Sequence, residues 1–216
     1  MTMTPSLRKF ALTAHVTSSV GWLGAVAAFL ALAVAGLTTD DAQRVRAAYL
    51  AMDLTGWFVI VPLSFASPLT GLVQSLGTSW GLFRHYWVLI KFLITIPATL
   101  LLLLHMQPVG HLARVVAETT LARGDLAGLR IQLLADAGAA LLVLLVATTL
   151  SVYKPWGMTR YGRRKEDEGR KVPHATPPEG MTTAATPWGL YVLAGFVGLV
   201  LLVVVLHLMG GGLGGH

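Results

Sequence analysis

Long apolar runs alternate with shorter polar segments along the whole chain. Five runs have the length that a helix needs to cross a bilayer, at residues 10–37, 54–77, 86–106, 131–153 and 188–209. Backbone N–H and C=O groups must be satisfied inside hydrocarbon, which favours helices over open strands. We therefore predict an all-α fold, an integral membrane helical bundle of five transmembrane helices. Four helices form its core, and the fifth, nearly all aliphatic, is peripheral.

The segments between the runs are richer in polar residues. We predict that 38–53 is a polar loop and that 107–130 is too polar to span, with helical character only at 112–121. Pro62 and Pro68 should kink the second span, as proline removes a helix hydrogen bond. We therefore predict that the chain has three parts, which are a four-span bundle at 1–154, a basic and largely disordered loop at 155–186, and the fifth helix with a glycine-rich tail at 187–216.

Composition supports a membrane protein. Hydrophobic residues make up 55% of the chain and charged residues 12%, whereas soluble domains carry about 25% charge. The net charge of +6 is concentrated, because seven of the 16 Lys and Arg residues lie at 154–171. Such a loop beside membrane spans is typical of the positive-inside rule and not of nucleic-acid binding. The chain has no cysteine, which excludes disulfides, Fe–S clusters, thiolate-ligated haem and covalent c-type haem.

The same basic residues predict the orientation. With the N-terminus inside, eleven Lys and Arg residues lie on the cytoplasmic side and five on the other. We therefore expect a multi-pass protein of the inner (cytoplasmic) membrane of a bacterial cell, with a cytoplasmic N-terminus. The 154–171 loop would then contact anionic lipid. An oligomer or a partner subunit remains open.

One face of the first span carries polar groups. His15, Ser18, Ser19 and Trp22 follow at i, i+3, i+4 and i+7 and share that face. An ionisable side chain at membrane depth usually faces a partner, a cavity or a cofactor. The alternative is a hydrogen bond from His15 to a neighbouring helix.

The third span has a similar face, formed by Lys91, Thr95, Ala98, Leu102 and His105. Lys91 either contributes to a site or extends its amine back to the membrane interface. It lies about 21 Å from His105 at 1.5 Å per residue, so His15 and His105 do not bind opposite faces of one haem. This separation predicts an inner site, with His15 and either His85 or Lys91, and a separate outer site.

The second and fourth spans add weaker signals. A stripe of small and polar residues favours close helix packing over a cavity wall, and it consists of Ser64, Ser67, Gly71, Gln74 and Thr78. Asp136, near the start of the fourth span, would cap its helix or pair with a loop arginine, Arg130 or Arg114.

Two patterns carry a family resemblance: His15-x6-Trp22-Leu23-Gly24, and His85-Tyr86-Trp87-x3-Lys91-x13-His105. Over the first four spans, the chain resembles small bacterial membrane proteins of the HemJ-type protoporphyrinogen oxidase and CopD copper-resistance group, and uncharacterised actinobacterial relatives. The HemJ side of the resemblance implies haem b or tetrapyrrole handling, with His15 as the main ligand and Lys91 as its companion. The CopD side implies copper handling. The chain departs from both in its fifth span and in a second span without strong ligands.

Three functions remain open. The first is a membrane protein that binds haem b near the cytoplasmic side and has a redox role, with cofactor-binding residues His15, Trp22, Arg84, His85 and Lys91. The second is copper binding or transport by outer imidazoles and nearby methionines, with metal ligands His105, His111 and His207. The third is a noncatalytic scaffold or subunit of a complex. The sequence leaves the catalytic residues, and whether the protein is an enzyme, undecided.

Overall fold

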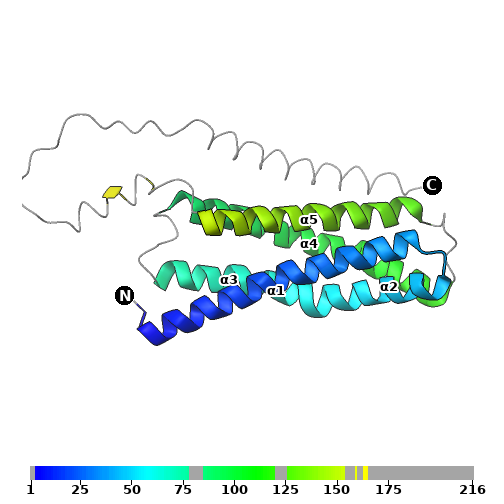
Figure 1. The fold of residues 1–216 in the computed structure, drawn as a ribbon, viewed down its shortest axis with the longest axis horizontal. Helices are drawn as coiled ribbons and strands as arrows, with labels where there is room; N and C mark the ends of the chain where they lie inside the picture. The colour runs from blue at the N-terminus through cyan, green and yellow to red at the C-terminus, as the bar shows by residue number, and fades with distance from the viewer. Residues whose placement is uncertain (1–2, 78–84, 120–125, 154–158, 160–162, 165–216) are drawn as a thin grey trace, which may run out of the picture.

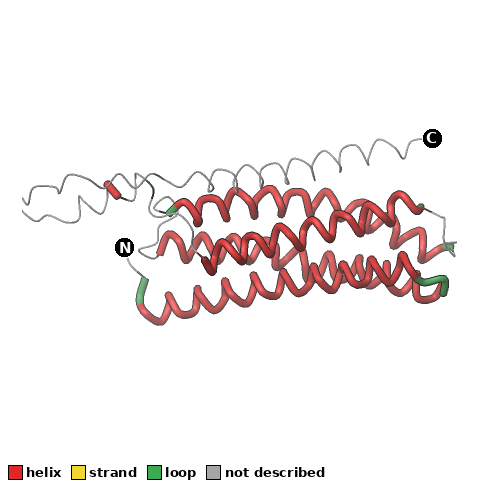
Figure 2. Tube along the Cα trace, turned by 45° about the horizontal axis from the view of Figure 1, so that its top comes forward, coloured by secondary structure: helices red, strands yellow, loops and turns green. Residues whose placement is uncertain are grey.

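The computed structural model is an elongated bundle of four antiparallel helical rods (Figures 1 and 2). It describes residues 3–77, 85–119, 126–153, 159, 163 and 164. The rods are α1 (Pro5–Thr38), a composite of α2 (Ala42–Thr55), η1 (Gly56–Ile60) and α3 (Val61–Gly77), then α4 (Tyr86–Glu118) and α5 (Ala127–Tyr153). The predicted all-α bundle and four of its spans are confirmed. The predicted 155–186 loop, except for residues 159, 163 and 164, and the predicted fifth span lie outside the described residues.

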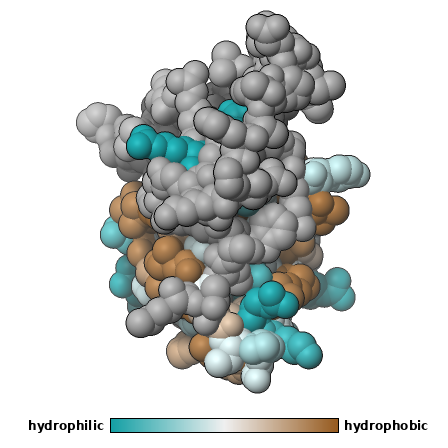
Figure 3. All heavy atoms as spheres, turned by 90° about the vertical axis from the view of Figure 1, so that its left-hand side faces the viewer, coloured by the Kyte–Doolittle hydropathy of each residue, from teal (hydrophilic) through white to brown (hydrophobic). Residues whose placement is uncertain are grey.

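All four rods are long and apolar enough to cross a membrane. The shortest has 27 residues, which is about 40 Å at 1.5 Å per residue, against a hydrocarbon thickness of about 30 Å. Large apolar side chains are exposed on every rod, among them Phe10, Phe58, Leu100 and Leu142. Brown apolar side chains also rim the bundle when it is viewed from its end (Figure 3). The protein is therefore a polytopic membrane protein whose outer surface contacts lipid.

The predicted loop at 38–53 is wrong, because most of it is the helix α2. Asp41 caps that helix and accepts hydrogen bonds from the backbone N–H groups of Gln43 at 2.9 Å and Arg44 at 3.4 Å. The helix is amphipathic: Arg44 and Arg46 are exposed, and its apolar face, at helical spacing, is buried against α1 and α4. That face consists of Val45, Ala48, Tyr49 and Met52.

A π-helical turn joins α2 to α3. It ends directly before Val61, whose N–H bonds to the carbonyl of Gly56, five residues back. Pro62 follows and has no N–H to continue the ladder. Gly56 also allows α4 to approach, since a Cβ there would lie 2.5 Å from Met106 Cε. The proline therefore coincides with a local change in helix type.

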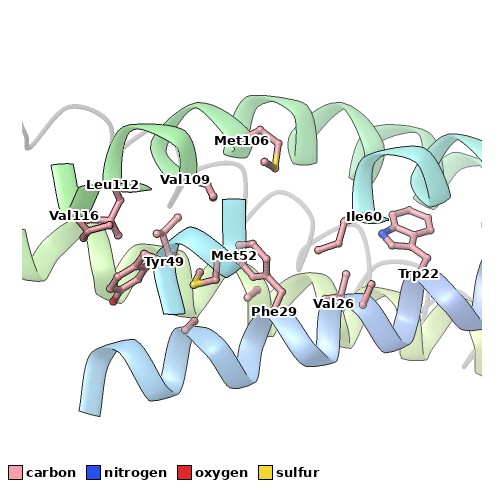
Figure 4. Close-up of a cluster of buried hydrophobic side chains, with 14 of the residues drawn as sticks. Trp22, Val26, Phe29, Tyr49, Met52, Ile60, Met106, Val109, Leu112 and Val116 are labelled. Carbon is pink, nitrogen blue, oxygen red and sulfur yellow. The ribbon is translucent and has the colours of Figure 1, made fainter. Parts of the chain in front are cut away.

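The third predicted span ends at 106, but its helix extends further, and the helical character predicted at 112–121 is found as far as Glu118. The helix α4 continues without a break to Glu118 and includes Pro108. Its polar residues after Met106 lie on an exposed face, while the opposite face continues the core. The residues of that core face are Val109, Leu112, Ala113 and Val116, and Figure 4 shows three of them near Tyr49 and Met52 of α2.

Arg130, predicted to lie in a loop, is instead buried inside the first turn of α5, with 1% of its surface exposed. Its Nε donates a hydrogen bond to the Tyr49 hydroxyl at 2.9 Å, and an Nη donates to the carbonyl of Gly36. The guanidinium also lies 5.6 Å from the centroid of the Tyr49 ring. This cluster connects α1, α2 and α5 at the end of the bundle where α1 passes into α2.

Candidate functional site: a histidine–lysine pair in a cavity

His15 of α1 faces α3 and α4. Its Nδ1 lies 3.0 Å from the carbonyl oxygen of Ser67 and 3.2 Å from the hydroxyl of Thr70. Because a carbonyl only accepts, Nδ1 carries the proton and Nε2 carries the lone pair. The amine of Lys91 in α4 lies 3.3 Å from that Nε2 and donates to it. The structure therefore brings together His15 and Lys91, which the sequence could only place at the same end of the bundle.

Small and hydroxylated residues let the ring fit against α3. A Cβ on Gly71 would lie 3.0 Å from Cε1 of His15, so a side chain there would displace the imidazole. The Ser19 hydroxyl bonds to that of Ser67 at 2.8 Å, and the Thr70 hydroxyl donates to the carbonyl of Ala66 at 2.6 Å. The polar stripe of the second span thus does both things considered for it, since it packs against α1 and also forms a cavity wall.

A cavity of about 440 Å³ opens beside this pair, and we call it the His15 cavity. Its volume lies within the range of about 300–1,000 Å³ typical of small-molecule and cofactor sites. Half of its fourteen lining residues are apolar, aromatic or glycine, and the other half carry polar side chains, which are those of His15, Lys91, Gln74, Ser67, Ser75, Thr95 and Ser151. Polar groups on the walls of a cavity fix the orientation of a bound molecule.

The other predicted members of the inner site are not all found here. Trp87 lines the His15 cavity. His85, at the N-cap of α4, lies beside Trp87, and the centroids of their two rings are 6.4 Å apart. Arg84 lies outside the described residues. Trp22, seven positions further along α1 than His15, lines a different cavity.

That second cavity, the His105 cavity, has a volume of about 100 Å³ and is bounded by α1, η1, α4 and α5. Nδ1 of His105 lies 3.0 Å from a carboxylate oxygen of Asp136. The ring of Phe29 packs at 60° to the imidazole with centroids 6.4 Å apart. Asp136 thus pairs with a histidine of α4, a partner that was not among those expected from the sequence.

The three predicted outer metal ligands do not form one described cluster. His105 is buried, whereas His111, six residues further along α4, is exposed, and His207 lies outside the described residues. No group of three or more His, Cys, Asp or Glu suited to a metal ion occurs in the described part of the chain. Here the imidazole of His105 is paired with a carboxylate instead.

One face of α4 links the two cavities. Lys91 and Thr95 line the His15 cavity, while Ala98, Leu102 and His105 line the His105 cavity. These five residues are the face predicted from their spacing, and that face points into the bundle. His15 and His105 lie in separate cavities.

No protein-family model, curated protein or solved structure matches the chain.

Proposed function

We propose that the chain is a membrane protein of the bacterial inner membrane that binds haem b or a related tetrapyrrole in the His15 cavity. The observation that carries this proposal is the orientation of His15. Histidines that ligate metals usually donate their other ring N–H to a carbonyl or carboxylate, which fixes the ring and leaves the lone pair for the metal. The contact of Nδ1 with the Ser67 carbonyl at 3.0 Å is of this kind.

The surroundings fit such a group. A tetrapyrrole needs flat apolar walls and cationic partners for its carboxylates, and the cavity offers Trp87, Phe92 and the amine of Lys91. That amine now lies 3.3 Å from Nε2, so it must move aside for Nε2 to bind iron. Its flexible four-carbon stem permits this motion and would bring the amine towards a carboxylate. Arg84 and His85 would contribute near the same end of α4.

A haem in this place would supply one-electron redox chemistry. The chain's own part is to orient one imidazole, to neutralise carboxylates with Lys91 and to exclude water with apolar walls. With the N-terminus in the cytoplasm, this cavity lies towards the cytoplasmic face, and the 154–171 segment would contact anionic lipid.

An absorption spectrum tests the proposal. The full chain, purified in mild detergent and supplied with haem b, should show a Soret band and sharp α and β bands after reduction with dithionite. His15→Ala should weaken haem binding by tenfold or more, because the donor atom is lost. His111→Ala removes an exposed histidine outside both cavities and should bind haem like the wild type.

Metal analysis of the same samples covers the two remaining functions. Stoichiometric copper without haem would replace the proposal by copper handling, with His105 as the first ligand to mutate. A protein that binds neither haem nor copper would be best explained as a scaffold or subunit. Equal haem binding by both histidine variants would refute the assignment of His15.

A further inference from the structure

The His105 cavity contains polar groups that take no part in the proposed haem site. No residue lines both cavities. Lys91 and His105 are fourteen residues apart on α4, about 21 Å along the helix. A ligand of the His105 cavity would therefore be distinct from one bound at His15.

The cavity reaches the lipid-facing surface between α4 and α5. Pro97, one of its lining residues, is exposed, and three further lining residues, Ala98, Leu101 and Ala139, are only partly buried. Most of the remaining walls are aliphatic or aromatic side chains. A molecule dissolved in the bilayer could thus enter from the side without crossing water.

A buried donor lies at the inner wall. Trp22 is 4% exposed, and its indole N–H has no hydrogen-bond partner in the structure, a cost that buried polar groups normally avoid. The pair of His105 and Asp136 lies at the same cavity and adds an imidazole backed by a carboxylate. An oxygen acceptor on a ligand would satisfy the indole N–H.

The size and lining limit the class of ligand. About 100 Å³ corresponds to about three water molecules at 30 Å³ each, but each water needs two to four polar partners, and these walls are mainly apolar. An apolar cavity of about 150 Å³ binds benzene, so this smaller one accepts at most one six-membered ring, with any long substituent outside it. A ring with a carbonyl oxygen matches both the apolar walls and the Trp22 indole N–H.

We propose that the His105 cavity binds the head group of a lipid-soluble quinone. The ring lies between Trp22 and α5, a carbonyl oxygen accepts from the Trp22 indole, and the tail leaves between α4 and α5 into the bilayer. This proposal does not depend on haem binding at His15.

The test is saturable binding of a radiolabelled decyl-substituted 1,4-benzoquinone to the immobilised full chain in detergent. Unlabelled quinone should displace the label. Decylbenzene, which has a six-membered ring and the same tail but no oxygen, should compete at least tenfold less well. Trp22→Phe keeps an aromatic ring and removes only the donor, so it should lower affinity about tenfold. Trp57→Phe, at an exposed tryptophan, is the matched control and should bind normally.

Two further variants separate this site from the haem site. Ala140→Leu fills the cavity and should abolish quinone binding, while His15→Ala should leave it unchanged. Lack of saturable binding to the wild type would overturn the proposal. So would equal competition by decylbenzene, or equal loss of affinity in Trp22→Phe and Trp57→Phe.

Discussion

Replacing Arg130 with methionine removes the buried cation that connects three helices at one end of the bundle. Two acceptors, the Tyr49 hydroxyl and the Gly36 carbonyl, lose their donor. A buried group left without its hydrogen bond costs about 1–3 kcal/mol. Methionine fills similar space and no longer requires a charge to be buried, which offsets part of this loss. We therefore expect the free energy of unfolding to fall by about 2–4 kcal/mol.

Thermal unfolding in mild detergent, followed by circular dichroism of the helices, measures this effect. For a chain of this size, 1 kcal/mol corresponds to about 2–4 °C, so the melting temperature should fall by about 4–16 °C. The control is Arg114→Met, which removes an exposed arginine of α4 and should change stability by less than about 0.5 kcal/mol. Tyr49→Phe combined with Arg130→Met should cost less than the sum of the single variants, because both remove the same hydrogen bond. Equal melting temperatures for the two arginine variants would refute the reasoning.

Two glycine substitutions extend these tests, with Gly24→Ala as their common control because a Cβ at Gly24 meets nothing within 4 Å. Gly36→Ala places a Cβ 2.9 Å from Cζ of the Tyr49 ring, so it should destabilise the protein by about 1–3 kcal/mol in the same unfolding assay. Gly71→Ala places a Cβ 3.0 Å from Cε1 of His15 and should lower haem affinity in a Soret titration without a comparable loss of stability. If Gly71→Ala and Gly24→Ala bind haem equally, the position of the imidazole against α3 is not what matters.

The transmembrane rods could be predicted where hydrophobicity alone determines them. Residues 10–37 and 131–153 are almost uninterrupted apolar runs, and both are helices in the structure. The helix at 42–55 was missed because its polar face dominates its composition. Its signal was present, as Val45, Ala48, Tyr49 and Met52 follow at i, i+3, i+4 and i+7.

The polar pairs were harder to predict, because they depend on how each helix is rotated against its neighbours. Spacing placed Lys91 and His105 on one face of α4 but could not say what faces them. The partner of His105 proved to be Asp136, through the packing of α4 against α5. Trp22 shares a helical face with His15, yet it lies seven positions further along α1, which is enough to place it at the other cavity.

The inward face of α4 explains why one bundle can hold two unlike cavities. Thr95 belongs to the His15 cavity and Ala98 to the His105 cavity, although they are only about 4.5 Å apart along the helix axis. The two cavities therefore nearly meet at this turn of α4, while the polar groups that would bind their ligands lie far apart. In such an arrangement each proposed ligand would have its own donors, but both would contact the same turn of α4. A change in the packing of that turn would alter both affinities, whereas loss of either histidine would alter only one.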